Sequence, residues 1–413
     1  MVLPLFEQRK IRPCNGDNYG HHSLFTICSL CEYDSIMGDK QARIYIIAGE
    51  ASGDLHGANL LKEIFALNPS ITVRAWGGDR MQKEGATLVK HISDLAFMGF
   101  VEVLLNLATI LKNINFCKKD ILEFKPDVLL LIDYPGFNLR IAQWAKENGI
   151  RVHYYISPQV WAWKKSRVKI IKASVDKMYT ILPFENDFYK QFDYETEYVG
   201  HPLLDEVENF NQSKLSREDF LTKNALSNDP IISILPGSRK QEIKVKLPIM
   251  LEAVKSLKNY QIVIAGAPNQ KPKMYEEFEA QGCKIIYGQT YDLLSNSEAA
   301  IVTSGTATLE TALLNIPEVV CYKGSWISYL IARSLIQIKF ISLVNLIMDK
   351  QIVRELIQGE CNSVRIREEL ELLLHDKEYR EEMLSNFAVM QEKLGGQGAS
   401  KKVAHSLLKT ISE

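Results

Sequence analysis

Short apolar runs that alternate with longer amphipathic stretches constrain the fold of this 413-residue chain more than any other feature. Ile44–Ala48, Val128–Ile132 and Val152–Ile156 have the length of buried strands, and Leu55–Leu67 and Leu139–Asn148 between them have helical spacing. Strands that are apolar on both faces must be covered on both faces, and strands connected through helices run parallel. The sequence therefore predicts a doubly wound parallel sheet.

The same alternation starts again in the second half of the chain. Ile231–Leu235, Ile262–Ala265 and Ala299–Thr303 are predicted strands, and Ile249–Leu257 is a predicted helix. The polar segment Glu206–Asp229 between the halves is typical of a linker with a surface helix. We expect an α/β protein with two Rossmann-like domains and a helical C-terminal tail. The predicted N-terminal extension, first domain, linker, second domain and tail are residues 1–40, 41–205, 206–228, 229–380 and 381–413.

Composition excludes several classes of protein. Lys and Arg number 49 against 50 acidic residues, so nothing favours nucleic acid or a general attraction to anionic surfaces. Seven scattered cysteines do not form a secreted disulfide framework, which favours the reducing cytoplasm. Cys28 and Cys31 form a CxxC without a second pair, so no metal or cofactor is predicted. The apolar stretch Trp326–Met348 is interrupted by polar residues, too often for a membrane span.

The first forty residues show neither helical nor strand periodicity and no signal-peptide pattern. Met37 stands shortly before the first predicted strand. We therefore expect Met37 to be the natural start, or residues 1–36 to be a dispensable, largely disordered extension.

Ligands of open parallel sheets bind beyond the carboxyl ends of the strands, and the turn after the first strand is one candidate. Glycines such as Gly53 let a backbone approach a ligand, and the start of the next helix can receive an anion. We predict acceptor or cleft roles for Glu50, Ser52 and Gly53. The alternative is a tight turn in which Ser52 or Asp54 caps the helix. The turn lacks the G-x-G-x-x-G spacing, which disfavours NAD.

Asp133 is the second candidate, because it follows the strand Val128–Ile132 directly. Partial desolvation at a strand end raises the pKa of a carboxyl toward values useful to a general base. The alternatives are that Asp133 caps the next helix or pairs with a lysine.

Two turns of the second half suit phosphate. Pro236–Arg239 combines a glycine turn with a guanidinium, which binds phosphate oxygens in a bidentate fork. Ser304–Glu310 gathers hydroxyls and amides at a helix start, and its glutamate could accept from ribose hydroxyls. An ordinary capping box would satisfy the same local rules. The predicted nucleotide and phosphate ligands are Gly237, Ser238, Arg239, Ser304, Gly305, Thr306 and Glu310.

An apolar helical seam, followed by three lysines, is predicted to contact membrane and acyl chains. Its residues are Phe100, Leu104, Leu107, Leu111 and Ile114. The alternative is a fully buried helix. Trp161 and Trp163 are likewise either core aromatics or anchors on the acceptor side.

Six motifs occur along the chain in an order that resembles the lipid-A-disaccharide synthase family, from about Arg43 to the C-terminus. They are Ala48–Asp54, Phe97–Val103, Ser157–Trp163, Gly200–Pro202, Leu235–Arg239 and Ser304–Glu310. The resemblance implies a GT-B glycosyltransferase fold with the acceptor in the first domain and the nucleotide in the second.

The same resemblance implies roles for single residues. Asp133 matches the essential aspartate of the family, Arg239 the arginine of its phosphate turn, and Asn345 an asparagine on the donor side. His201 lies in the Gly-His-Pro motif and is assigned to the acceptor or cleft side. Many members of the family carry a second aspartate where this chain has Gly136, which leaves a shared role for two carboxylates open.

The implied reaction joins UDP-2,3-diacylglucosamine to 2,3-diacylglucosamine 1-phosphate, with inversion at the anomeric carbon and without a metal. The resemblance also implies a peripheral protein at the cytoplasmic surface of the inner membrane; a homodimer is an open alternative. Two other classes remain: a UDP-sugar 2-epimerase, which needs no acceptor, and a non-catalytic membrane-associated interaction protein.

Overall fold

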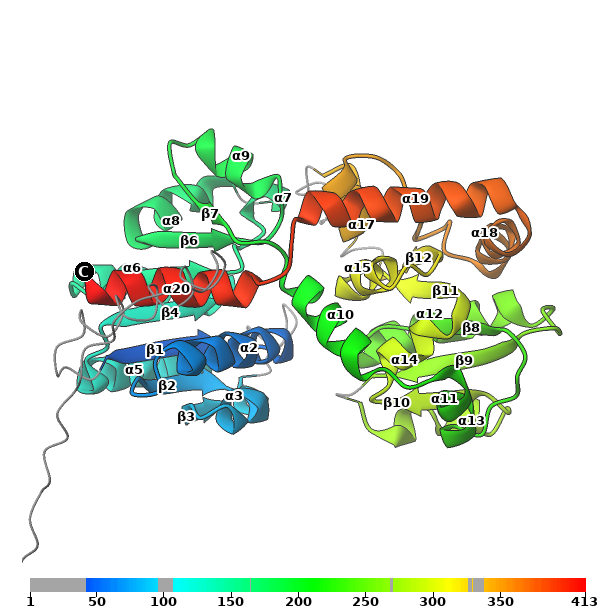
Figure 1. The fold of residues 1–413 in the computed structure, drawn as a ribbon, viewed down its shortest axis with the longest axis horizontal. Coiled ribbons are helices and arrows are strands. Elements are labelled where there is room, and N and C mark those ends of the chain that lie inside the picture. Colours follow the sequence, from blue (N-terminus) through cyan, green and yellow to red (C-terminus); the bar gives the residue numbers. More distant parts are fainter. Residues whose placement is uncertain (1–41, 96–106, 164, 268–269, 326–328, 330–337) are drawn as a thin grey trace, which may run out of the picture. The chain divides into compact units, whose positions relative to one another are not determined.

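The computed structural model describes residues 42–95, 107–163, 165–267, 270–325, 329 and 338–413 (Figure 1). Two parallel sheets with helices on both faces make up this part of the chain, so the predicted fold class is confirmed. The proposed start at Met37 and the Cys28–Cys31 pair fall outside the described residues.

The first sheet has seven strands in the order β3-β2-β1-β4-β5-β6-β7, and its neighbours pair in parallel. The strands are β1 (Arg43–Ala48), β2 (Thr72–Gly77), β3 (Thr87–His91), β4 (Val128–Ile132), β5 (Val152–Tyr155), β6 (Lys177–Thr180) and β7 (Glu197–Tyr198). Its helices are α2 (Ala51–Leu67), α3 (Asp79–Lys83), α5 (Leu107–Phe124), α6 (Pro135–Glu147), α7 (Val160–Trp163), α8 (Val168–Ser174) and α9 (Glu185–Lys190).

Alternate residues of the central strand β1 point into two different cores, as the pleat of a strand requires. Ile44 and Ile46 belong to the core that contains Leu61 of α2. Tyr45 and Ile47 belong to the core formed with α5 and α6. Burial on both faces explains why the strand is apolar along its length.

The second sheet has six strands in the order β10-β9-β8-β11-β12-β13, again paired in parallel. They are β8 (Ile231–Leu235), β9 (Gln261–Gly266), β10 (Lys284–Tyr287), β11 (Ser297–Thr303), β12 (Glu318–Tyr322) and β13 (Arg354–Ile357). The accompanying helices are α10 (Pro202–Ser213), α11 (Arg217–Lys223), α12 (Lys240–Val254), α13 (Glu276–Glu279), α14 (Thr290–Ser295), α15 (Thr306–Leu313) and α17 (Leu343–Met348).

Three helices begin earlier than their sequence pattern indicates: α2, predicted from Leu55, begins at Ala51, and prolines explain the other two. Pro135 is the first residue of α6, a position where proline lacks only an amide that would have no helical partner. Pro248 lies inside α12. Because proline usually stands at the start of a helix, the sequence pattern places the helix start after Pro248 and misses the first half of α12. The polar segment Glu206–Asp229 contains the end of α10 and all of α11, one helix more than the predicted single surface helix. The predicted domain bounds stay predictions.

The tail consists of α18 (Ser363–His375), α19 (Lys377–Leu394) and α20 (Ala399–Ser412), which confirms its helical character. α20 packs on the first sheet, where Ser406 accepts a hydrogen bond from Lys177 of β6 and donates one to Glu197 of β7. Among the described residues, no helix combines the length and apolarity that a membrane crossing requires.

Candidate functional site

The two sheets share one topological property that locates their ligand sites. In the first sheet the strand order reverses between β1 and β4, and in the second it reverses between β8 and β11. The crevice at such a reversal is the usual ligand site of an open parallel sheet. The four turns selected from the sequence follow these four strands, so the structure brings them together in two pairs.

Close packing explains the glycines after β1. A Cβ on Gly49 would lie 2.3 Å from the ring of Tyr134, so only glycine leaves room for that ring. A Cβ on Gly53 would lie 3.2 Å from the Cβ of Ala48, because the start of α2 approaches β1 closely. Ala48 pairs with Ile132, which sets the two turns side by side.

The alternative in which Ser52 or Asp54 caps α2 is wrong. Glu50 is the N-cap residue and its side chain makes no capping hydrogen bond. Asp54 instead accepts hydrogen bonds from the backbone amides of Gly78 (2.6 Å) and Met81 (3.1 Å), and so holds the start of α3. Ser52 is exposed in the first turn of α2.

Asp133 has a strained backbone, with a φ of 44°, and Tyr134 follows it with 48°. Non-glycine residues rarely adopt this left-handed conformation, and clusters of such strain occur at functional sites. The conformation of Asp133 is held by its own backbone: its amide donates to the carbonyl of Tyr155 (3.0 Å), and its carbonyl accepts from Asn138 (2.8 Å) and from the hydroxyl of Tyr154. Tyr134, not Asp133, is the N-cap residue of α6.

The pKa of Asp133 is raised from 3.8 to about 6, chiefly by burial and also by the neighbouring carboxylate of Glu50, against a hydrogen bond from the amide of Tyr134 that lowers it. Burial also raises the pKa of Glu50. The pKa of Asp133 therefore depends on the charge of Glu50. A carboxylate with a pKa near 6 is still ionised at neutral pH and is a stronger proton acceptor than an ordinary aspartate.

His201 has a structural role that its motif did not indicate. Its Nδ1 accepts from the amide of Leu203 (3.2 Å) and caps α10. The pKa of His201 is lowered to about 3, chiefly by burial and also by the adjacent His56. His56 is itself buried, with a pKa of about 4, and was not selected from the sequence. Both imidazoles are neutral at physiological pH.

The second pair of turns, after β8 and β11, is also in contact. Gly237 has a φ of 108°, which favours glycine. A Cβ there would lie 2.5 Å from Glu242 Oε2 and 3.3 Å from the side chain of Thr303, the last residue of β11. The turns carrying Ser238 and Ser304 are thus neighbours.

Arg239 is the N-cap residue of α12, and its guanidinium donates to Glu242 Oε1 at 3.1 Å. Its side chain is 63% exposed. A surface ion pair of this kind contributes only about 0.2–1 kcal/mol, so little energy opposes a move of the guanidinium to a phosphate. Ser238 beside it is exposed as well.

No capping box forms at the start of α15. Gly305 is the N-cap residue without a side-chain cap, and Gly305 and Thr306 are exposed. Ser304 donates to the carbonyl of Ile341 at 3.2 Å. Glu310 accepts from the hydroxyl of Tyr291 (3.0 Å), and burial raises its pKa. Tyr291 was not selected from the sequence, because its partner Glu310 lies 19 residues further along the chain.

Both polar atoms of the Asn345 side chain are hydrogen-bonded within the protein, so none is free to bind the sugar nucleotide. Its amide oxygen accepts from the backbone amides of Ile352 (2.6 Å) and Val353 (3.0 Å), and its nitrogen donates to Glu355 (2.9 Å). The side chain is fully buried. In this structure Asn345 fastens α17 to the segment that leads into β13, and its assignment to the donor side stays a prediction.

Comparison with known proteins assigns the family. The model of the lipid-A-disaccharide synthetase family matches residues 44–407. The chain belongs to this family. The lipid-A-disaccharide synthase of Syntrophus aciditrophicus is 41% identical over 90% of this chain and 98% of its own length. That of Myxococcus xanthus is 39% identical over 89% and 97%.

Solved structures agree on the fold. The UDP-GlcNAc 2-epimerase from Neisseria meningitidis bound to UDP-GlcNAc has a TM-score of 0.61 at 15% identity and covers 89% of this chain and 100% of its own. The calicheamicin glycosyltransferase CalG4 has a TM-score of 0.56 at 14% identity, over 90% and 98%. At these identities the likeness shows the GT-B fold alone, and sequence separates this family member from the epimerases.

The apolar seam of this lipid-A-disaccharide synthetase family member is described only in part. Phe100 and Leu104 lie outside the described residues, as does the side chain of Leu107, where α5 begins. Leu111 is 57% exposed, whereas Ile114 is buried. In the described part of α5 the fully buried alternative is therefore wrong. The other large exposed apolar residues on α5 are Phe116 and Leu122.

Trp161 is a core aromatic. It is buried, stacks edge-on against Phe184 at 4.9 Å between ring centroids, and donates from Nε1 to Glu185 at 3.2 Å. The side chain of Trp163 lies outside the described residues. In the part of the chain that the structure describes, no group of three or more His, Cys, Asp or Glu side chains could hold a metal ion.

Proposed function

We propose that the chain condenses UDP-2,3-diacylglucosamine with 2,3-diacylglucosamine 1-phosphate to give lipid A disaccharide 1-phosphate and UDP. Its family and its relatives give it a glycosyltransferase role in lipid A biosynthesis. The observation that carries the chemistry is Asp133, a strained, partly buried carboxyl at the reversal of the first sheet with a pKa of about 6.

In this proposal the 6-hydroxyl of the acceptor attacks the anomeric carbon from the face opposite the leaving group. The new oxygen–carbon bond forms as the bond from that carbon to the β-phosphate oxygen breaks, which inverts the centre. Asp133 receives the hydroxyl proton, and UDP leaves with the bonding electrons. The rigid backbone around Asp133 fixes the carboxylate, which favours proton transfer in one geometry.

Negative charge grows on the departing UDP, and the second sheet offers groups to neutralise it. Arg239 is exposed and weakly held, and the uncapped start of α15 directs amides outward beside Ser304. Glu310, which accepts a hydrogen bond from Tyr291, would accept another from a ribose hydroxyl. These groups would replace the metal that other glycosyltransferases use, so no cofactor is required.

Acylated substrates require contact with a membrane surface. Leu111, Phe116 and Leu122 are exposed on α5, and Lys112 and Lys119 are exposed on the same helix. Apolar residues interleaved with lysines suit insertion into the headgroup region. We place the enzyme on the cytoplasmic surface of the inner membrane as a peripheral protein, and leave a homodimer open.

The test is an incubation with UDP-diacylglucosamine, with and without diacylglucosamine 1-phosphate, followed by chromatography of the lipid and nucleotide products. The proposal requires disaccharide and UDP in equal amounts, and only when the acceptor is present. Conversion of the UDP-sugar without acceptor would identify an epimerase. An unchanged donor in both tubes would identify a binding protein.

A further inference from the structure

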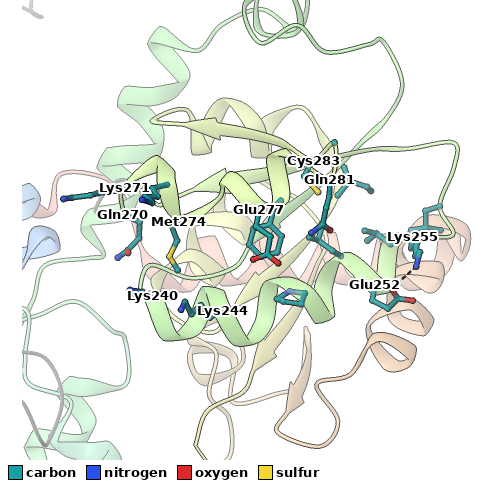
Figure 2. Close-up of a pocket in the computed structure, with 18 residues that line it drawn as sticks. Lys240, Lys244, Glu252, Lys255, Gln270, Lys271, Met274, Glu277, Gln281 and Cys283 are labelled. Atoms are coloured by element: carbon teal, nitrogen blue, oxygen red, sulfur yellow. Dashed lines mark hydrogen bonds and ion pairs between the residues drawn. The ribbon is translucent and has the colours of Figure 1, made fainter.

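A long groove runs along the outer side of α12, between this helix, β9 and α13 (Figure 2). Its volume is about 1430 Å³, larger than the roughly 300–1,000 Å³ of ordinary small-molecule pockets. The groove is separate from the proposed catalytic residues, none of which lines it.

One end of the groove is strongly basic. Figure 2 shows Lys240, Lys244 and Lys271 at this end, with the Lys271 side chain directed away from the other two, and Lys273 lines the same groove. All four lysines are exposed. The other end is electrically balanced, because Lys255 forms an ion pair with Glu252 at 3.4 Å. Glu277, which is exposed, lines the groove between the two ends, so the excess of positive charge lies at the lysine end.

The floor of the groove is apolar and accessible. Leu251, Leu257, Ile262, Met274 and Phe278 line it, and each is only half-buried, so their apolar surface remains in contact with water. Part of the apolar surface of these five side chains is therefore accessible from within the groove. Cys283 lies at the balanced end, far along the groove from the lysines in Figure 2.

The basic end adjoins the phosphate turn without being part of it. Gln270, which lines this end, donates from Nε2 to the carbonyl of Ser238 at 2.9 Å. Lys240 directly follows Arg239 and begins α12. A ligand anchored at this end would therefore lie next to the turn that we assign to the donor pyrophosphate.

We propose that this groove binds an anionic phospholipid of the membrane, with the phosphate on Lys240, Lys244 and Lys271 and one acyl chain along the apolar floor. A free phosphate compound would satisfy the lysines but leave the floor exposed, and a neutral lipid would leave the lysines without partners. A charged head with a long apolar tail satisfies both ends. The second domain thereby gains its own membrane contact, beyond the one proposed for α5; this inference rests on the proposed function only in placing the enzyme at a membrane.

Co-sedimentation with vesicles tests the proposal on the full chain. Vesicles of phosphatidylcholine alone are compared with vesicles that also contain phosphatidylglycerol, at about 0.1 M salt. We expect tighter binding to the anionic vesicles, and a loss of roughly tenfold or more in that affinity for Lys244→Glu with Lys271→Glu. Leu251→Gln, which leaves the charge unchanged, should weaken the same binding severalfold.

The matched control is Lys223→Glu with Lys258→Glu, which makes the same change in net charge at exposed lysines outside the groove. Unfolding curves check that every variant is folded, and affinity for neutral vesicles should stay as in the wild type. An equal loss of affinity in the control pair, or no preference of the wild type for anionic vesicles, overturns the proposal.

Two further measurements identify other occupants, and each would also overturn the proposal. A higher KM for the UDP-sugar in detergent-solubilised assays of the groove variants would assign the lysines to the donor. Concentration-dependent dimers that the Leu251→Gln variant loses would assign the groove to a second copy of the chain. Failure of transfer itself in the wild type would contradict the proposed function and leave the vesicle result intact.

Discussion

Replacement of Asp133 by asparagine tests the proposed chemistry and its electrostatic basis in one variant. Burial and the charge of Glu50 raise the pKa of Asp133 from 3.8 to about 6 in the folded protein. The folded state therefore binds this proton more tightly than the unfolded state. Folding stability from this group is greatest below about pH 4, falls as the pH rises to about 6, and the penalty is complete above that.

The size of the penalty follows from the shift in pKa. A shift from 3.8 to about 6 corresponds to at most about 3 kcal/mol. Asp133 is only partly buried, so solvent screening reduces this to about 1–2 kcal/mol. Asp133→Asn should therefore raise Tm by roughly 3–6 °C at about pH 8 and leave it unchanged at about pH 3.

Activity should change in the opposite direction. Without a proton acceptor, disaccharide formation should fall by roughly 100-fold or more, while the affinity for UDP in calorimetry stays near the wild-type value. Asp127→Asn is the control at the other end of β4, where the carboxylate accepts from the amide of Arg43 at 2.9 Å. Turnover of Asp133→Asn close to that of this control, or a lower Tm at about pH 8, would refute the reasoning.

Four further outcomes are expected. Arg239→Ala should raise the donor KM and lower kcat together, because the guanidinium is proposed to bind pyrophosphate before and during transfer; unchanged kinetics would reject that role. Glu50→Gln should move the acid limb of the kcat profile to lower pH, since the Glu50 charge raises the pKa of Asp133; an unmoved limb contradicts the coupling. EDTA should leave the rate of transfer unchanged, whereas inactivation reversed by Mg²⁺ or Mn²⁺ would require a metal. Gly136→Asp should fold and gain about 0.5–1 kcal/mol in urea unfolding, because a side chain there meets nothing within 4 Å and the position lies in the first turn of α6; a loss of stability would contradict this.

The strands that sequence could locate are those buried on both faces. β4 is apolar from Val128 to Ile132, and its predicted bounds are confirmed. β2 and β3 lie toward the edge of the first sheet and include Arg74 and Lys90, which interrupt the apolar run. Edge strands are partly solvated, so their composition does not distinguish them from loops.

The positions of the candidate site were predictable for a topological reason. Turns that follow parallel strands meet at one edge, so Glu50 and Asp133 could each be selected as candidates, but only the structure shows that β1 and β4 are neighbours. Their roles were less predictable, because long-range partners decide them. Asp54 accepts a hydrogen bond from the backbone amide of Gly78, and Asn345 accepts one from the backbone amide of Ile352. Local spacing cannot reveal a hydrogen bond to a segment that arrives by folding.

The two sheets place opposite chemistry at equivalent points. The reversal of the first sheet carries Glu50 and Asp133, and the reversal of the second carries Arg239 beside the uncapped start of α15. A transfer that releases UDP needs a proton acceptor for one substrate and positive charge for the other, and this division supplies both.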